Sequence, residues 1–265
     1  MLIAAYWAAK GAASSVDWCE PNYVVSQFIA EFWNTLSSIP IALAGLYGLY
    51  RLGGSKISGS KISARFTWSF LAVAIIGLGS VAFHGTLLKS AQALDELPMI
   101  YCSLTLVYAL ANRTEIGTPK SRRWAIGLTA YAVAFTVAYA LLPQLFELFI
   151  VSYGLIVGGV VIVSARLSWG PTGTPTHKKL YYWAAGGYLS GVFFLWMPEH
   201  VFLACDHPAQ AAHLHAWFHS TSVVGTYSWL LLLIWDHLTV NGHTPEFAPG
   251  VVPWIVPGAA ASEDR

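Results

Sequence analysis

The stretch GLGSVAFHGTLL, residues 77–88, is apolar over almost its whole length but carries Ser80 and His84 four positions apart. Residues at this spacing lie on one face of a helix, one turn apart. Far downstream, HAWFH at 215–219 places His215 and His219 at the same spacing in another apolar stretch. Both segments therefore predict helices that bring imidazole side chains into an apolar environment.

The composition predicts that these helices cross a membrane. Of the 265 residues, 56% are hydrophobic and 10% are charged, and the mean hydropathy is +0.56. Soluble domains contain about a quarter charged residues. The net charge of +1 argues against an electrostatic partnership with nucleic acid. Because the N-terminal stretch lacks a basic segment followed by a long apolar core, we expect no cleaved signal peptide.

Seven apolar runs have the length of about 20 residues that a membrane-spanning helix needs. They lie near residues 27–50, 66–88, 95–111, 124–142, 145–165, 180–203 and 214–238. Pro143 is expected to mark the turn between the fourth and fifth runs. We expect an all-α membrane protein in which residues 1–240 form a single-domain seven-transmembrane helix bundle with an internal lipid-accessible cavity. Residues 241–265 are expected to form a mobile cytosolic tail.

The basic residues predict the orientation of the bundle. Eleven of the fourteen Lys and Arg residues fall in the first, third and fifth loops. They are Arg51, Lys56, Lys61 and Arg65; Arg113, Lys120, Arg122 and Arg123; and Arg166, Lys178 and Lys179. Because basic residues concentrate in cytosolic loops, the N-terminus is predicted to face the lumen or the exterior and the C-terminus the cytosol. In that orientation six ionisable residues of the apolar runs share one depth near the lumenal surface: Glu31, His84, Asp95, Glu96, His215 and His219.

Ionisable groups inside a bilayer are costly, so each is a candidate functional residue. His215 and His219 are typical of the two-ligand half of a helical metal site, and His84 would supply a third ligand from another helix. Three neutral imidazoles leave one tetrahedral position of zinc open, as in catalytic sites. The alternative is that these histidines only form hydrogen bonds between helices; the carboxylates at the same depth favour the metal.

Zinc generates a reactive water, and hydrolysis then also needs a proton carrier and a group that stabilises an oxyanion. Asp95 could carry the proton. Ser80, one turn before His84, could donate its hydroxyl to the oxyanion. Two simpler roles stay open: Ser80 as a small packing residue in the glycine-rich stretch, and Asp95 as the N-cap of its helix.

Other residues give weaker indications. His200, His207 and His213 lie near the predicted site and are alternative ligands, whereas His177, His237 and His243 fall on the cytosolic side. The stretch DWCEPN, residues 17–22, places several oxygen-bearing side chains ahead of Glu31, a pattern that suits calcium. An acidic turn before a helix is also ordinary capping chemistry.

The segments DWCEPNYVVSQFIAEFWNTLS (17–37), GLGSVAFHGTLL, LDELPMIY (94–101) and HAWFH together resemble the alkaline ceramidases. These enzymes belong to a superfamily of seven-helix membrane hydrolases that also includes the adiponectin receptors. The four segments occur in the same order and span nearly the whole helical region. The resemblance implies that the substrate is a ceramide-type lipid, whose amide is hydrolysed by zinc-activated water to a sphingoid base and a fatty acid.

The resemblance also implies roles for individual residues. It matches the zinc ligands to His84, His215 and His219, and the catalytic serine and aspartate to Ser80 and Asp95. It matches a calcium site to Asp17, the backbone carbonyl of Trp18, Glu20, Asn22 and Glu31. It further pairs Cys19 with a cysteine after the sixth helix, here Cys205, on the side where disulfides persist. Cys102 is expected to be unpaired. The chain departs from the family at Glu199, near the end of the sixth helix, where an aspartate is usual, and at Pro21.

Two other functions compete with ceramide hydrolysis. An adiponectin-receptor-like lipid sensor with residual hydrolase activity is the alternative, but those receptors have the opposite orientation. A retinal-binding protein needs a lysine in the seventh helix, and none occurs in residues 214–238. We expect membrane lipids as partners, no obligate protein partner, and a location in the endoplasmic reticulum or Golgi rather than the plasma membrane.

Overall fold

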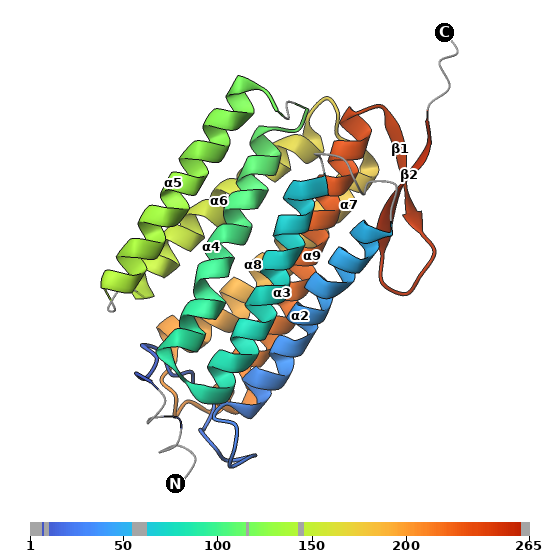
Figure 1. The fold of residues 1–265 in the computed structure, drawn as a ribbon. Coiled ribbons are helices and arrows are strands. Elements are labelled where there is room, and N and C mark those ends of the chain that lie inside the picture. Colours follow the sequence, from blue (N-terminus) through green and yellow to red (C-terminus); the bar gives the residue numbers. More distant parts are fainter. Residues whose placement is uncertain (1–6, 8–10, 55–62, 115–116, 143–145, 261–265) are drawn as a thin grey trace.

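The computed structural model describes residue 7 and residues 11–54, 63–114, 117–142 and 146–260. Within these ranges the chain is mostly helical, and seven long helical segments form a bundle (Figure 1). Six are the helices α2 Phe32–Gly53, α3 Ser63–Thr86, α4 Lys89–Ala111, α5 Pro119–Leu141, α6 Phe146–Trp169 and α9 Leu214–Val240. The other is continuous over residues 175–202 and is called the sixth helical segment here. It consists of α7 Pro175–Tyr181 and α8 Gly187–Gly191, with π-helical turns at Tyr182–Gly186, Val192–Trp196 and Pro198–Phe202.

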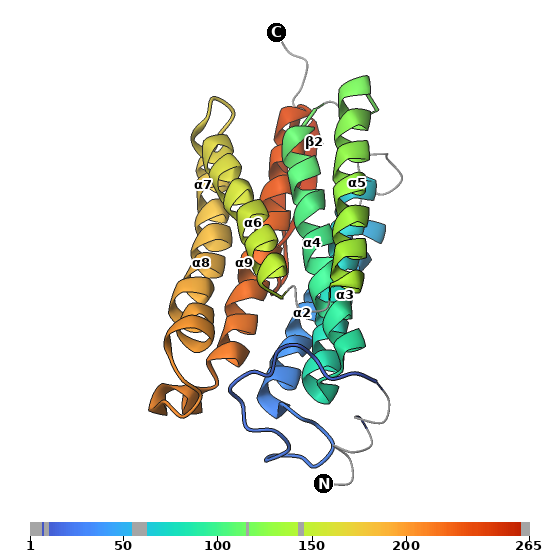
Figure 2. The same ribbon diagram turned by 90° about the vertical axis from the view of Figure 1, so that its left-hand side faces the viewer.

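The helices run side by side, and the residues before α2 lie across one end of the bundle (Figures 1 and 2). α3 packs between α2 and α4, and α9 packs against α2 and the sixth helical segment. Leu230–Ile234 of α9 are five consecutive buried residues, so this helix is covered on all sides there. A 3-10 helix at Pro208–Ala212 leads into α9. The predicted turn at Pro143 lies outside the described residues.

Apolar exposure indicates that the bundle lies in a membrane. The most apolar 18-residue window of α6 has a mean hydropathy of 2.4, yet only 17% of that window is buried. In α9 the corresponding buried share is 61%. In the described part of the chain, α3, α4, α5, α6 and α9 are long and apolar enough to span a bilayer. The seven-span arrangement, which also requires α2 and the sixth helical segment to cross, stays a prediction.

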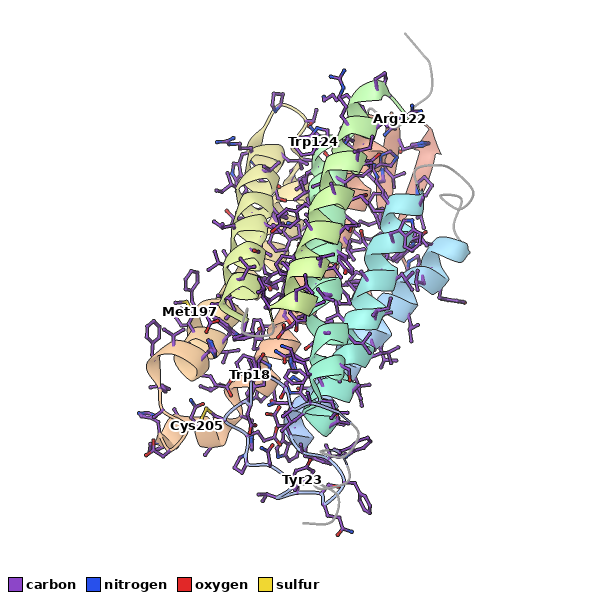
Figure 3. The ribbon with its side chains drawn as sticks, turned by 60° about the vertical axis from the view of Figure 1, so that its left-hand side comes forward. Trp18, Tyr23, Arg122, Trp124, Met197 and Cys205 are labelled. Carbon is purple, nitrogen blue, oxygen red and sulfur yellow. A yellow bond between two sulfur atoms is a disulfide. The ribbon has the colours of Figure 1, made fainter. Side chains whose placement is uncertain are left out.

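The two ends of the bundle differ in character. Trp18, Tyr23 and Cys205 lie at one end, and Arg122 and Trp124 lie at the other (Figure 3). We call the first the site end, because the predicted catalytic residues lie there, and the second the basic end. The orientation of the bundle, with the site end toward the lumen, stays a prediction.

The start of α4 excludes one role that the sequence left open. This helix begins at Lys89 with Leu88 as its N-cap residue, earlier than the predicted start at residue 95. Asp95 therefore lies in the second turn, inside the hydrogen-bonded part of the helix. Its alternative role as an N-cap is wrong.

The C-terminal segment is ordered over most of its length, contrary to the expected mobile tail. β1 His243–Ala248 and β2 Trp254–Ala260 form an antiparallel hairpin. Trp254 is fully buried, with its ring centroid 5.7 Å from that of Phe70 in α3. The frequent Gly and Pro residues suggested a flexible chain, but here they shape a hairpin that buries one large aromatic side chain. The fold is therefore mostly, not entirely, helical.

Candidate metal centre

Three buried histidines meet at the site end. His84 comes from the last turns of α3, and His215 and His219 come from the first two turns of α9. One nitrogen of each ring lies within 4.8 Å of the others, close enough for a single metal ion to bind all three. No other such group of histidine, cysteine or acidic side chains occurs in the part of the chain that the structure describes. The geometry thus brings together the three residues that the sequence singled out.

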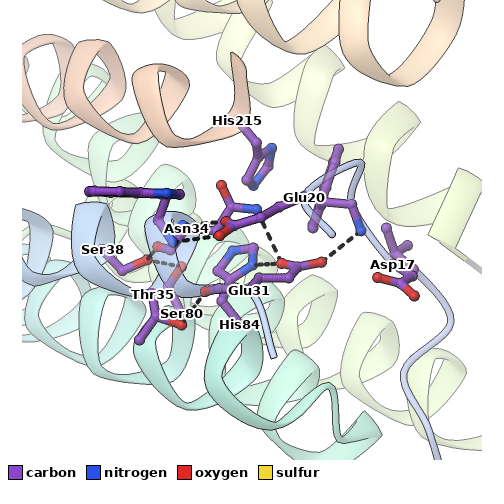
Figure 4. Close-up of polar contacts among 12 residues, drawn as sticks. Asp17, Glu20, Glu31, Asn34, Thr35, Ser38, Ser80, His84 and His215 are labelled. Atoms are coloured by element: carbon purple, nitrogen blue, oxygen red, sulfur yellow. Dashed lines mark hydrogen bonds and ion pairs between the residues drawn. The ribbon is translucent and has the colours of Figure 1, made fainter. Parts of the chain in front are cut away.

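Two of the rings have a hydrogen-bond acceptor at Nδ1. The Glu31 carboxylate contacts His84 Nδ1, and both side chains are fully buried (Figure 4). Ser37 Oγ lies 2.8 Å from His219 Nδ1 and donates its own proton to the Asn34 carbonyl, 3.1 Å away. When the Ser37 hydroxyl donates to this carbonyl, it accepts from Nδ1–H of His219, and that tautomer leaves Nε2 unprotonated. This use of Nδ1 is common for metal-binding histidines.

The structure passes a direct test of whether a metal fits. His84 Nε2 is buried and has no hydrogen-bond partner. A buried polar atom without a hydrogen-bond partner is rare in proteins, so a ligand or ion is expected to contact it. The ring centroids of His215 and His219 lie 5.2 and 5.0 Å from that of His84. Three imidazoles this close suit a cation that prefers nitrogen ligands.

Ser80 and Asp95 lie beside the histidines and line the same cavity. The Ser80 hydroxyl is 2.9 Å from that of Ser38 and also interacts with the Asp95 carboxylate. Gly79 makes this approach possible, because a Cβ atom there would lie only 2.2 Å from the Leu94 carbonyl oxygen of α4. Close packing is thus the role of Gly79, while the side chain of Ser80 faces Ser38 and the Asp95 carboxylate.

An apolar cavity of about 410 Å³ extends from this site into the bundle. Along α4 it is lined by Asp95, Met99, Cys102 and Leu106, which lie on one helix face. At 1.5 Å per residue, that face is about 16 Å long. The acidic and histidine side chains of its lining, Asp95, Glu96, His215 and His219, lie at the site end of this path, so the cavity fits a long apolar molecule whose polar group meets the histidines.

The predicted calcium residues gather at the N-terminus of α2. Glu20 accepts hydrogen bonds from the N–H groups of Trp33 (2.7 Å) and Asn34 (2.9 Å), which caps the helix. This is why α2 begins at Phe32 rather than near residue 27, with Glu31 at its N-cap. Glu20 therefore performs the capping role that the sequence left open.

The remaining calcium candidates lie next to this cap. Glu31 accepts from the Trp18 N–H at 2.8 Å, and Asn22 donates its amide to both oxygens of Asp17 at 3.1 and 3.0 Å. Burial raises the pKa of Asp17, and the hydrogen bond from Asn22 opposes part of that rise. A nearby cation would stabilise the charged form of this carboxyl group. The residues are adjacent and hydrogen-bonded within the N-terminal segment and α2, and the calcium site stays a prediction.

A disulfide joins Cys19 to Cys205, as the resemblance implied, and Cys102 is free and buried. The bond ties the N-terminal segment to the loop that follows the sixth helical segment. It holds Trp18 against the site, where its ring stacks on His215 with centroids 3.7 Å apart.

The other histidines do not join the group of three. His200 packs against Trp196, with ring centroids 4.9 Å apart, and His207 caps the short helix that begins at Pro208. His213 is the residue before α9 and has a positive φ of 53°. At the basic end, His177 lies 3.4 Å from Asp236, His237 is hydrogen-bonded to Arg65 and Asn241, and His243 begins β1.

Apart from Glu31, which the sequence singled out, sequence reasoning missed the polar residues at the start of α2 that support the site. Glu31, Asn34 and Ser38 are each at most 1% exposed. They stand at i, i+3 and i+7, so they form one polar face on an otherwise apolar helix. That spacing was a readable signal that α2 packs against the histidines.

Comparisons with known proteins identify the family. The family model described as Ceramidase matches residues 10–257. Alkaline ceramidase 3 of Mus musculus is 29% identical over 266 residues, which cover 95% of this chain and 94% of that protein. Alkaline ceramidase of Drosophila melanogaster is 24% identical over 91% of this chain and 83% of its own length. Alkaline ceramidase YPC1 of Saccharomyces cerevisiae is 40% identical over a shorter stretch, 37% of this chain and 29% of its own length. The chain therefore belongs to the alkaline ceramidase family, whose members are hydrolases.

Proposed function

We propose that this protein is a zinc-dependent intramembrane amide hydrolase that cleaves ceramide to a sphingoid base and a free fatty acid. The observation that carries the proposal is the convergence of three buried imidazoles beside Ser80 and Asp95, at one end of an apolar cavity. The names of the relatives supply the substrate class. They leave the receptor alternative without support, so we do not retain it.

His84, His215 and His219 would hold the zinc ion. Zinc, when bound, supplies a nucleophile at neutral pH by lowering the pKa of a coordinated water to about 7. The cavity walls exclude bulk water and keep the substrate chains parallel to α4, so that the amide lies next to the histidines. Such positioning by itself accounts for a large part of the rate enhancement of many enzymes.

Ser80 and Asp95 would perform the remaining chemistry. As negative charge develops on the amide oxygen, the Ser80 hydroxyl donates a hydrogen bond to it. Asp95 accepts a proton from the attacking water and delivers it to the nitrogen of the leaving sphingoid base. Protonation is needed there because an amide nitrogen leaves poorly as an anion. The contact between Ser80 and Asp95 keeps both groups on the same side of the substrate.

Calcium is proposed as a structural or regulatory ion held by Asp17, the Trp18 carbonyl, Glu20, Asn22 and Glu31. Glu31 supports this reading because it contacts both the N-terminal segment and His84. We further propose that the site end faces the lumen of the endoplasmic reticulum or Golgi and the basic end faces the cytosol.

Lipid mass spectrometry provides the test. Purified protein is incubated with a panel of ceramides, with and without a zinc chelator. We expect release of a fatty acid and a sphingoid base that stops on chelation and returns with added zinc. His84→Ala, His215→Ala and His219→Ala are each expected to lose bound zinc and activity. Chelator-resistant hydrolysis, or full zinc content in those variants, would contradict the proposed role of the metal.

A further inference from the structure

One of the three imidazoles lacks the support that the other two have. Nδ1 of His84 contacts Glu31, and Nδ1 of His219 contacts Ser37. Nδ1 of His215 is buried and has no hydrogen-bond partner. A ring whose Nδ1 has no acceptor can rotate, which would move Nε2 away from the proposed metal position. It can also change tautomer, which would put a proton on Nε2 and block metal binding.

A second buried atom without a partner faces this nitrogen. Glu199 Oε2 lies 3.7 Å from His215 Nδ1 and makes no hydrogen bond. Glu199 is only 5% exposed, at the end of the sixth helical segment. A hydrogen bond here needs a separation of about 3.2 Å or less, so a closure of about 0.5 Å would satisfy both atoms at once.

The other oxygen of the same carboxylate is already engaged. Glu199 Oε1 accepts a hydrogen bond from the Cys19 N–H at 3.3 Å. Cys19 is held by its disulfide to Cys205, and the neighbouring Trp18 covers one face of the His215 ring. Trp18 thus restrains the tilt of the ring, and an acceptor at Nδ1 would restrain its rotation within that plane.

We propose that Glu199 is a positioning residue for His215. In the metal-bound protein its Oε2 accepts a hydrogen bond from His215 Nδ1–H, which selects the tautomer whose Nε2 is free to bind the ion. This inference rests on the proposed zinc site. It completes a pattern in which each of the three rings has an acceptor at Nδ1: Glu31, Ser37 and Glu199.

The substitution Glu199→Gln separates positioning from packing. A carboxylate offers two acceptors, one for the Cys19 N–H and one for His215 Nδ1–H. The amide of glutamine has nearly the same shape but only one acceptor, so its NH₂ group must face one of the two donors. Glu147→Gln is the matched control, because Glu147 is an exposed carboxylate in the first turn of α6.

The zinc affinity of the full-length protein, measured by competition with a chromophoric chelator, is the decisive readout. Loss of a partner that orients a metal-binding histidine costs about 10- to 100-fold in metal affinity. We expect that loss for Glu199→Gln and no change for Glu147→Gln. The melting temperature of the metal-free Glu199→Gln protein should stay near that of the wild type. Wild-type zinc affinity in Glu199→Gln would overturn the inference.

Two further variants, Glu199→Asp and His215→Ala, distinguish loss of positioning from loss of folding or of the zinc site. If metal-free Glu199→Gln is unstable, Glu199→Asp, which keeps both acceptors, is expected to bind zinc more tightly than Glu199→Gln; equal affinity would refute a positioning role. If His215→Ala loses zinc while Glu199→Gln retains it fully, the zinc site stands and this inference fails. If the wild type binds no zinc, the proposed function itself fails.

Discussion

The substitution Gly79→Ala is expected to push α3 away from α4 at the point where Ser80 meets Asp95. A Cβ atom at residue 79 would lie 2.2 Å from the Leu94 carbonyl oxygen and 2.8 Å from the Asp95 nitrogen. Both are backbone atoms, so no change of rotamer can relieve the contact. An ordinary contact begins near 3.4 Å, which requires the two helices to separate by about 1.2 Å.

The magnitude follows from that displacement. Overpacking of this kind costs about 1–3 kcal/mol of stability, and alanine returns about 1 kcal/mol through its higher helix propensity. The net loss of stability should therefore be no more than about 2 kcal/mol. The activity should fall much further, because a misplacement of about 1 Å can reduce a rate by about 100-fold. His84 lies more than a turn away on α3, so zinc should stay bound.

Ceramide hydrolysis by the purified variant, measured beside its zinc content and melting temperature, tests this reasoning. Gly127→Ala in α5 is the control, because a Cβ atom there meets nothing within 4 Å. We expect that control to keep its activity and to be slightly more stable than the wild type. Gly79→Ala with undiminished activity would show that the close approach of α3 and α4 does not position the catalytic pair.

Three other changes test separate parts of the structure. Asp95→Asn should bind zinc normally yet lose activity by about 100-fold or more, because the amide cannot carry the proton; full hydrolysis in that variant would refute the proton-transfer role. Calcium should raise the melting temperature of the wild type, and less so in Glu20→Gln. The effect should shrink as the pH falls through the raised pKa of Asp17, since protons compete for the same carboxylate; a melting temperature indifferent to calcium and to chelators would count against the site. Trp254→Ala should destabilise the protein by about 3–5 kcal/mol, because a fully buried indole leaves a large cavity. Val251→Ala, fully exposed in the same hairpin, should change stability by less than about 0.5 kcal/mol, and an equal effect of the two would mean that the hairpin does not pack on the bundle.

The helices were predictable because each long apolar run forms its own backbone hydrogen bonds. The residues at which the helices begin were harder to predict. α2 and α4 begin where local contacts allow: Glu20, 13 residues before Trp33, caps α2, and the short connection after Thr86 lets α4 begin at Lys89. Apolar periodicity carries no information about such contacts.

The three histidines were predictable from the four-residue spacing of His215 and His219 together with depth, since a bundle of fixed orientation places residues of equal depth near one another. The residues that hydrogen-bond to these histidines could not be predicted from the sequence. Ser37 and His219 lie 182 positions apart, and Glu199 and Cys19 lie 180 apart. Neither serine nor glutamate indicates by its type which distant ring it will face.

The amino-acid sequence by itself determined that this chain is an apolar helical bundle and which side chains are the candidates for its chemistry. Both follow from properties of single residues and short stretches, namely transfer into lipid and the basicity of imidazole and carboxylate. The tertiary structure alone decided which nitrogen of each ring faces the others, how closely Ser80 approaches Asp95, and that the C-terminal segment folds against the bundle. Those features depend on contacts of a few ångströms between segments far apart in the chain, which form only when the helices pack.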